Sequence, residues 1–143
     1  MPSPARFAPI LCLLALAAAP VFATPKAADV SGAWAFETQT YGSHCQLSGS
    51  MMIRPAGKDY ACTFTAQERC SDITVKAQES CEAKRLPDGS FNIIATVNKV
   101  SPQVGYEPDN FELKIESGAH MTGMLRSFHS APVDFFRGDA PVS

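Results

Sequence analysis

Long apolar runs, helical periodicity and catalytic motifs are scarce in this chain of 143 residues. After residue 23 no stretch approaches the roughly 20 apolar residues of a membrane-spanning helix, and no window of helical length repeats its apolar residues every 3.6 positions. The motifs Gly-x-Ser-x-Gly and His-Glu-x-x-His and the glycine-rich phosphate loop are missing. The sequence therefore favours a protein that is not an enzyme, and we expect no cofactor.

The chain also lacks a large excess of positive or negative charge. The chain has 12 basic and 14 acidic residues, and its formal net charge is −2. Scattered charge of this kind forms no basic patch for DNA or for an anionic membrane. The three histidines, His44, His120 and His129, are far apart, and no Cys-x-x-Cys pair occurs. We therefore expect no nucleic-acid partner and no metal site.

Residues 1–23 have the features of a secretory signal peptide. Arg6 supplies an early positive charge, and the apolar run FAPILCLLALAAAPVFA ends at Ala23, the expected cleavage site. The alternative is a lipid anchor on Cys12, although the three residues before it lack the small side chains of a lipoprotein motif. We expect a mature chain of residues 24–143 that forms one domain and is periplasmic or secreted.

Four cysteines remain in the predicted mature chain: Cys45, Cys62, Cys70 and Cys81. In an exported protein they most simply form two disulfides. A turn at 55–58 brings position 45 nearly opposite position 68, and a reversal near 69–71 brings position 62 close to 81. This register favours the pairs Cys45–Cys70 and Cys62–Cys81, with a bulge where two cysteines are offset. The pairing Cys45–Cys62 with Cys70–Cys81 stays open.

Apolar and polar residues alternate along most of the chain, which is typical of half-buried strands. Turn sequences with Gly, Pro or Ser separate the alternating runs, and short links imply antiparallel neighbours. The pattern predicts eight strands, at residues 31–38, 45–54, 59–67, 72–84, 90–99, 110–116, 119–127 and 131–137. We expect an all-β fold, an eight-stranded antiparallel up-and-down barrel, because closure removes exposed sheet edges. A β-sandwich is the alternative.

The inward phase of these strands carries many large side chains. They are Trp34, Phe36, Leu47, Met51, Ile53, Tyr60, Phe64, Phe91, Ile93, Phe111, Leu113, Met121, Leu125 and Phe135. The interior of an eight-stranded barrel is just filled by such residues or holds one small ligand. We expect a filled interior or a small pocket near the barrel mouth.

The single tryptophan lies at the start of the first predicted strand, in Gly32-Ala33-Trp34. This Gly-x-Trp element resembles the signature of lipocalins and related calycin barrels, and Arg137 follows the last predicted strand. The resemblance implies that Trp34 closes the barrel floor and that the Arg137 guanidinium covers its ring, a cation–π contact of about 0.5–2 kcal/mol. The chain is shorter than an ordinary lipocalin. It is also similar to small bacterial periplasmic inhibitors of metalloproteases, which typically have one disulfide.

Two regions are candidates for binding. In the 99–110 loop, Val104 and Tyr106 have no strand to bury them, and long loops at a barrel mouth often contact ligands. The second region is a set of apolar residues on the outward phase, which form a partner surface if they are contiguous. Its members are Met52, Ile94, Met124 and Phe136, with Phe128 nearby.

The remaining clusters of polar residues are expected to be ordinary surface residues rather than catalytic groups. Ser43, His44 and Cys45 are adjacent, and adjacent residues on a strand point to opposite faces, so they do not form a nucleophile and its base. Acidic residues on the outward phases are expected to be solvated rather than to act as an acid–base pair. They are Glu112, Glu116 and Asp134.

Together these features predict a non-enzymatic exported protein that binds a small apolar ligand or a protein partner. The barrel mouth and the 99–110 loop form the expected site. The alternative is an inhibitor of a secreted protease or lysozyme. In that case the N-terminal sequence TPKAADVS enters an enzyme cleft, as the similarity to the inhibitor family implies.

Overall fold

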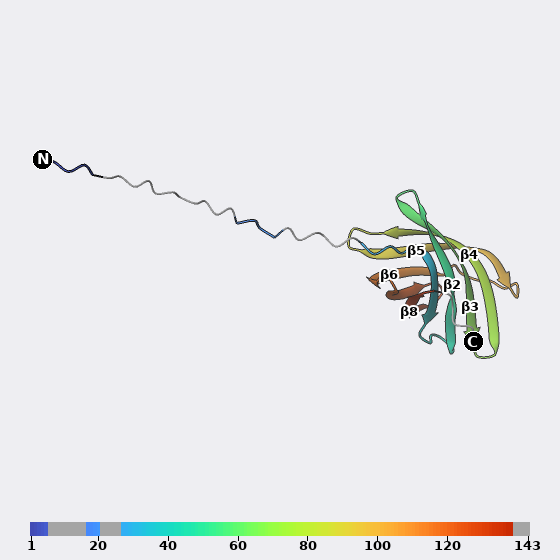
Figure 1. Ribbon diagram of the computed structural model, residues 1–143. Helices are drawn as coiled ribbons and strands as arrows, with labels where there is room; N and C mark the ends of the chain where they lie inside the picture. Colours follow the sequence, from blue (N-terminus) through green and yellow to red (C-terminus); the bar gives the residue numbers. More distant parts are fainter. Residues whose placement is uncertain (6–16, 21–26, 139–143) are drawn as a thin grey trace.

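The structure, a computed structural model, describes residues 1–5, 17–20 and 27–138. Most of the expected leader, its cleavage site and residues 139–143 lie outside these ranges (Figure 1). Among the described residues, no helix is long and apolar enough to cross a membrane.

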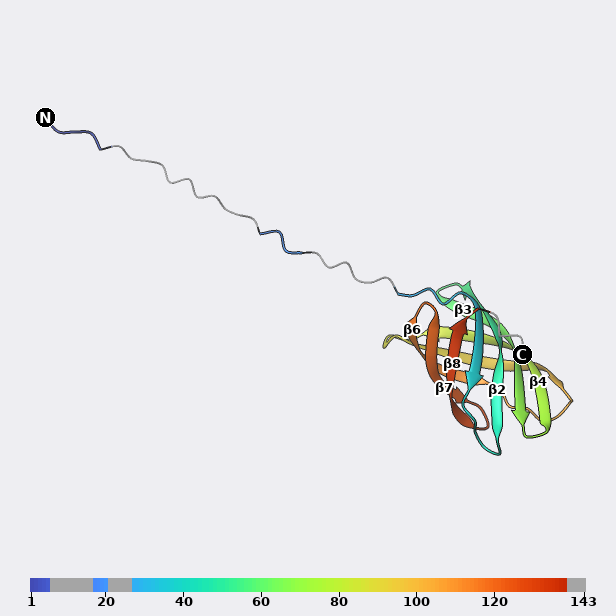
Figure 2. The ribbon, with the colours of Figure 1, turned by 60° about the horizontal axis from the view of Figure 1, so that its bottom comes forward.

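The described chain forms eight strands. They are β1 (Gly32–Thr38), β2 (Cys45–Ala56), β3 (Asp59–Cys70), β4 (Ile73–Arg85), β5 (Ser90–Ser101), β6 (Asn110–Ser117), β7 (His120–Arg126) and β8 (Ser130–Arg137). Each strand pairs antiparallel with the next, and β8 pairs with β1, so the sheet closes into a barrel (Figures 1 and 2). The predicted barrel is confirmed, each predicted strand coincides with an observed one to within three residues, and the sandwich is excluded.

The expected turn at 55–58 is wrong in detail. Pro55 and Ala56 still pair with β3, opposite Tyr60 and Asp59, and the reversal is the two-residue turn that starts at Gly57. Gly57 has φ of 61°, which suits a tight hairpin because glycine adopts positive φ without steric cost. The shorter turn shifts the register by two residues.

The shifted register places the cysteines directly opposite one another. Cys45 on β2 is bonded to Cys70 on β3, with Cα atoms 4.0 Å apart, and Cys62 on β3 to Cys81 on β4, with Cα atoms 4.8 Å apart. These are the pairs that the strand pattern favoured, and no bulge is needed at either. Two bridges that close such loops each stabilise a fold by about 2–4 kcal/mol. They are consistent with an oxidising compartment.

Four phenylalanines fill the centre of the barrel. Phe36, Phe64, Phe111 and Phe135 contact one another with ring centroids between 5.1 and 6.0 Å apart. Gly49 leaves space for them, because a Cβ there would lie 2.5 Å from the Phe36 ring. The residues predicted to point inward are all buried except Tyr60, which is partly buried and packs against this core.

One end of the barrel, the tryptophan end, is closed by Trp34, Arg137 and residues 28–31. Trp34 is fully buried, and its Nε1 donates a hydrogen bond of 2.8 Å to the Val30 carbonyl. The Arg137 guanidinium carbon lies 4.3 Å from the centre of the indole. A Cβ on Gly32, whose φ is 113°, would lie 2.9 Å from Arg137 Nη1. The Gly-x-Trp element thus accommodates the cation that covers the ring.

Arg137 also fixes the backbone around the tryptophan end. Its Nε donates to the Gly118 carbonyl at 3.0 Å and its Nη2 to the Asp29 carbonyl at 2.7 Å, while Nη1 donates to the Ser31 carbonyl. Arg85 Nη2 donates to the Ala28 carbonyl at 2.5 Å. The segment before β1 is therefore held against the barrel.

Candidate functional site

The opposite end, the loop end, carries the connections 39–44, 102–109 and 127–129. Here the sheet separates between β5 and β6. Their paired residues run from Ser90 to Ile93 on β5, whereas β5 continues to Ser101 beside β4. At the point of separation the Asn110 side chain accepts a hydrogen bond of 2.8 Å from the Ala95 amide. The barrel wall is consequently completed by side chains and by the 102–109 loop.

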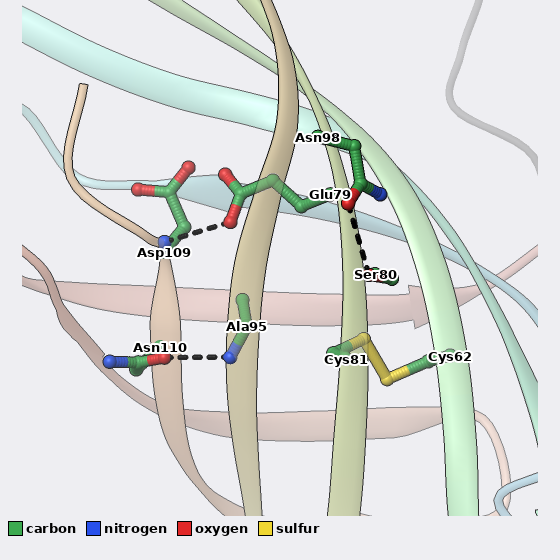
Figure 3. Close-up of a disulfide and its surroundings, with 8 residues drawn as sticks. All are labelled: Cys62, Glu79, Ser80, Cys81, Ala95, Asn98, Asp109 and Asn110. Atoms are coloured by element: carbon green, nitrogen blue, oxygen red, sulfur yellow. Dashed lines mark hydrogen bonds between the residues drawn. A yellow bond between two sulfur atoms is a disulfide. The ribbon is translucent and has the colours of Figure 1, made fainter. Parts of the chain in front are cut away.

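Two buried acids lie where the strands separate. Glu79 on β4 is 1% exposed and Asp109, just before β6, is 2% exposed. Figure 3 shows the Glu79 carboxyl directed toward Asp109. The Asp109 amide donates to Glu79 Oε2 at 3.1 Å, and the Tyr106 hydroxyl donates to Asp109 Oδ2 at 2.8 Å. Glu79 Oε1 is buried and has no donor partner among the described residues.

This arrangement changes the protonation of both acids. Burial, and next the neighbouring Asp109, raises the pKa of Glu79 to about 9. Burial also raises the pKa of Asp109, and burial together with the Asp109 charge raises the pKa of the Tyr106 hydroxyl. Glu79 therefore holds a proton at neutral pH, and the acid pair avoids two facing negative charges.

A third acid, Glu68 on β3, lies at the same end. The Tyr41 hydroxyl donates to Glu68 Oε2 at 2.5 Å, and Tyr41 is 8% exposed. Burial, and next this hydrogen bond to Glu68, raises the pKa of the Tyr41 hydroxyl, so the donor keeps its proton. None of the described ion pairs supplies a cation to Glu68, Glu79 or Asp109.

A cavity of about 500 Å³ opens beside Glu68 and Tyr106, and we call it the loop-end cavity. Its lining residues are Cys45, Glu68, Cys70, Gly105, Tyr106, Glu107, Ser127, Phe128 and His129. Phe128 is 78% exposed at the rim, and its ring meets the His129 ring at a centroid distance of 4.8 Å. The volume is within the range of small-molecule sites.

The structure separates the residues that the sequence singled out for binding. Tyr106 lines the loop-end cavity, and it is partly buried and hydrogen-bonded rather than a free apolar side chain. Val104 borders a hollow of about 410 Å³ beside the end of β5. Met52 borders an outer hollow of about 420 Å³, and Phe136 another of about 500 Å³.

The outward apolar series does not form one patch. Ile94 is 62% exposed beside Glu82, and Met124 lies between Glu112 and Pro132. Phe136 stacks on His120 at a centroid distance of 4.9 Å. Polar neighbours thus lie beside Ile94, Met124 and Phe136.

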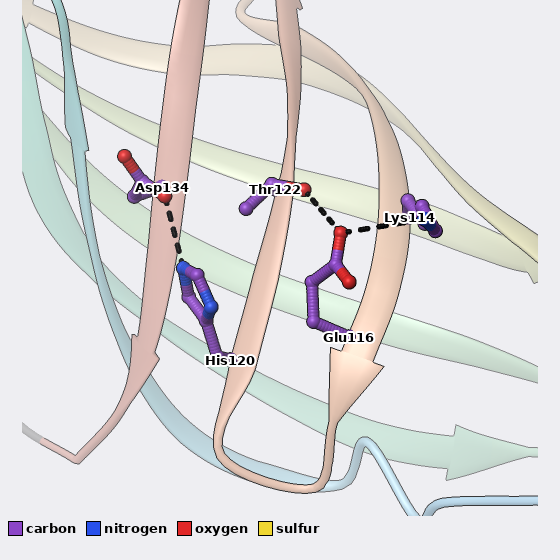
Figure 4. A network of polar contacts seen from close by, with 5 residues as sticks. All are labelled: Lys114, Glu116, His120, Thr122 and Asp134. Atoms are coloured by element: carbon purple, nitrogen blue, oxygen red, sulfur yellow. Dashed lines mark hydrogen bonds and ion pairs between the residues drawn. The ribbon is translucent and has the colours of Figure 1, made fainter.

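A polar network on the outer face of β6, β7 and β8 forms no second site. His120 Nε2 lies 2.9 Å from Asp134 Oδ1, and Glu116 accepts from Thr122 at 2.9 Å and faces Lys114 at 3.7 Å (Figure 4). Exposed pairs of this kind stabilise by about 0–1 kcal/mol. Within the described ranges, no group of three or more His, Cys, Asp or Glu residues is arranged to hold a metal ion.

The acids of the loop end were not predicted from the sequence. Glu68 continues the inward phase of Cys62 and Phe64, and Glu79 lies between Ala77 and Cys81 on the inward phase of β4. An acidic residue on an otherwise apolar phase was the available signal. Asp109 precedes β6 and gives no such signal.

Comparison with known proteins supports the fold alone. No protein-family model and no curated protein matches the chain. A solved structure that does match is a de novo designed fluorescence-activating β-barrel. It is 18% identical, with a TM-score of 0.52, over 76% of this chain and 93% of the designed one. The lipocalin relationship stays a prediction, and what is shown is a small eight-stranded antiparallel barrel.

Proposed function

We propose that this protein is an exported, non-enzymatic binding module that holds a small ligand in the loop-end cavity. The observation that carries the proposal is the position of this cavity on a rigid, closed scaffold. Phenylalanines fill the barrel centre, Trp34 and Arg137 close the far end, and both disulfides fasten the strands that lead to the cavity. A cavity on a fixed frame binds with little ordering cost.

The composition of the cavity agrees with a ligand that is partly apolar. Tyr106 and Phe128 present aromatic rings, and Phe128 is exposed without a packing partner other than His129 in the described contacts. The fold is similar to that of the designed fluorescence-activating barrel, and an eight-stranded barrel can hold one small ligand. Export is supported by the two disulfides and by the expected leader.

Native mass spectrometry of the protein purified from its own host tests the proposal. We expect a bound small molecule whose occupancy is lower in Phe128→Ala and unchanged in Met52→Ala, because Met52 borders a different hollow. A protein that carries no adduct and that no compound of a small-molecule library stabilises against heat would contradict it.

The inhibitor alternative has less support. Residues 28–31, half of the expected inhibitory segment, are tied to Arg85 and Arg137 by hydrogen bonds. A segment fixed in this way does not extend freely into an enzyme cleft. Residues 24–26 lie outside the described residues. Inhibition of secreted metalloproteases or lysozymes by the purified protein would restore this alternative.

A further inference from the structure

The acids of the loop end lack the partners that such residues usually have. Buried acidic side chains in proteins are normally paired with a cation or a metal ion. Glu79 and Asp109 are buried and Glu68 is partly buried, and all three have tyrosine hydroxyls or a backbone amide as donors instead of a cation. None of the residues that line the loop-end cavity is Lys or Arg. Positive charge is therefore what this end of the barrel is missing.

A second observation points in the same direction. Glu79 is 1% exposed, its Oε1 has no donor partner, and the group that faces it is another carboxyl, Asp109 (Figure 3). Asp109 is bonded in turn to Tyr106, which forms a wall of the cavity. The acid pair thus reaches the cavity only through Tyr106, because neither Glu79 nor Asp109 lines the cavity itself.

We infer that the loop-end cavity binds a small aromatic amine, whose ammonium group lies against the Glu68 carboxylate and whose ring packs against Tyr106 and Phe128. The inference rests on the proposed function, because it assigns a chemical class to the ligand of the same cavity. An ammonium–carboxylate hydrogen bond is about twice as strong as a neutral one. The exposed Phe128 ring and the Tyr106 ring can stack on the ring of such a molecule and can form cation–π contacts with its ammonium group.

The selectivity of the cavity follows from these charges. An anion entering it meets Glu68 and Glu107, and His129 is the one lining residue of a basic type. A neutral molecule of the same shape leaves Glu68 with the Tyr41 hydroxyl alone. We therefore expect affinity to decrease from cation to neutral molecule to anion within one series of ligands.

Calorimetric titration with tyramine, tyrosol and 4-hydroxyphenylacetate tests the inference, because these probes share a ring and differ in charge. We expect tyramine to bind at least about tenfold more tightly than tyrosol, and 4-hydroxyphenylacetate most weakly. In Glu68→Gln the preference for tyramine over tyrosol should fall to about threefold or less. The amide oxygen of the substituted side chain still accepts from Tyr41, so this variant should fold. Glu112→Gln, an exposed acid on β6, is the matched control and should keep the full preference.

Each other outcome overturns the inference. Equal binding of tyrosol and tyramine excludes an amine site and leaves the proposed function intact. An unchanged preference in Glu68→Gln excludes Glu68 as the ammonium partner. If none of the probes binds at millimolar concentration, the amine class is wrong, and the adduct seen by native mass spectrometry then decides the proposed function separately.

Discussion

The two ends of the barrel satisfy charge in different ways. At the tryptophan end a cation, Arg137, covers an aromatic ring and donates to three backbone carbonyls. At the loop end Glu79 and Asp109 are buried against each other without a cation. The first arrangement satisfies its charge within the chain, whereas the second is satisfied by a proton.

Under the proposed function, this difference separates a structural end from a ligand-binding end. Groups that bind ligands are commonly held in environments that cost stability, because their best partner is absent until the ligand arrives. At the tryptophan end the chain itself supplies every group that covers Trp34. At the loop end the strands separate beyond Ile93, and a cavity whose lining includes Glu68 and Glu107 lies beside the loops. We therefore expect substitutions at the first end to change stability and substitutions at the second to change binding.

Trp34→Ala should give the largest decrease in the free energy of unfolding. Trp34 is fully buried, and its removal eliminates the surface on which Arg137 rests. Replacing a buried aromatic residue by alanine costs about 3–5 kcal/mol. Urea unfolding measures this loss, and a decrease of less than about 1 kcal/mol would show that the tryptophan end is not a main source of stability.

Arg137→Ala should give the next largest effect, a decrease of about 1.5–3 kcal/mol in the free energy of unfolding. The variant loses a cation–π contact of about 0.5–2 kcal/mol and the hydrogen bonds to three carbonyls. Arg137→Lys keeps the positive charge but not the planar fork of donors, so its loss should be intermediate. If lysine restores full stability, charge alone closes this end.

The tryptophan end could be predicted from the sequence, whereas the loop end could not. Alternation placed Trp34 inside at a strand start, and the resemblance to lipocalins implied that Arg137 covers it. The observed pairing of β1 with β8 does bring the two residues together. Strand register likewise brought the cysteines together. Period-two patterns of this kind depend on local sequence alone.

The loop end depends on contacts that no local pattern contains. Tyr106 bonds to Asp109 within one loop, but Asp109 meets Glu79 across 30 positions and Tyr41 meets Glu68 across 27. The separation of β5 from β6 leaves space for these side chains, yet the alternation of β5 continues past it as far as Val97. The sequence pattern places Glu68 and Glu79 on an inward phase. It does not predict their contacts with loop residues.

A change of pH should affect the stability of the loop end more than that of the tryptophan end. Among the described residues, only the loop end buries an acid pair. The pKa of Glu79 is raised from 4.5 to about 9 on folding, so the folded protein holds a proton that the unfolded chain releases between these values. Stability should therefore fall as pH rises from about 5 to 9. Glu79→Gln should remove this part of the decrease and be more stable than the wild type at pH 9 by at least about 1 kcal/mol. Urea unfolding at pH 5, 7 and 9 measures both, and parallel curves for the two proteins would contradict it.

Phe128→Ala should have the smallest effect on stability and a clear effect on binding. The side chain is 78% exposed, and surface substitutions away from packed groups change stability within about 0.5 kcal/mol. Its ring nevertheless forms the rim of the loop-end cavity, so its loss should weaken tyramine binding about threefold to tenfold, the worth of one aromatic contact.

Phe136→Ala is the matched control, because Phe136 is 52% exposed on the outer wall and stacks on His120. It should leave binding unchanged. Equal weakening in both variants would mean that the ligand contacts the outer wall, and the division of the barrel into a structural and a functional end would then fail.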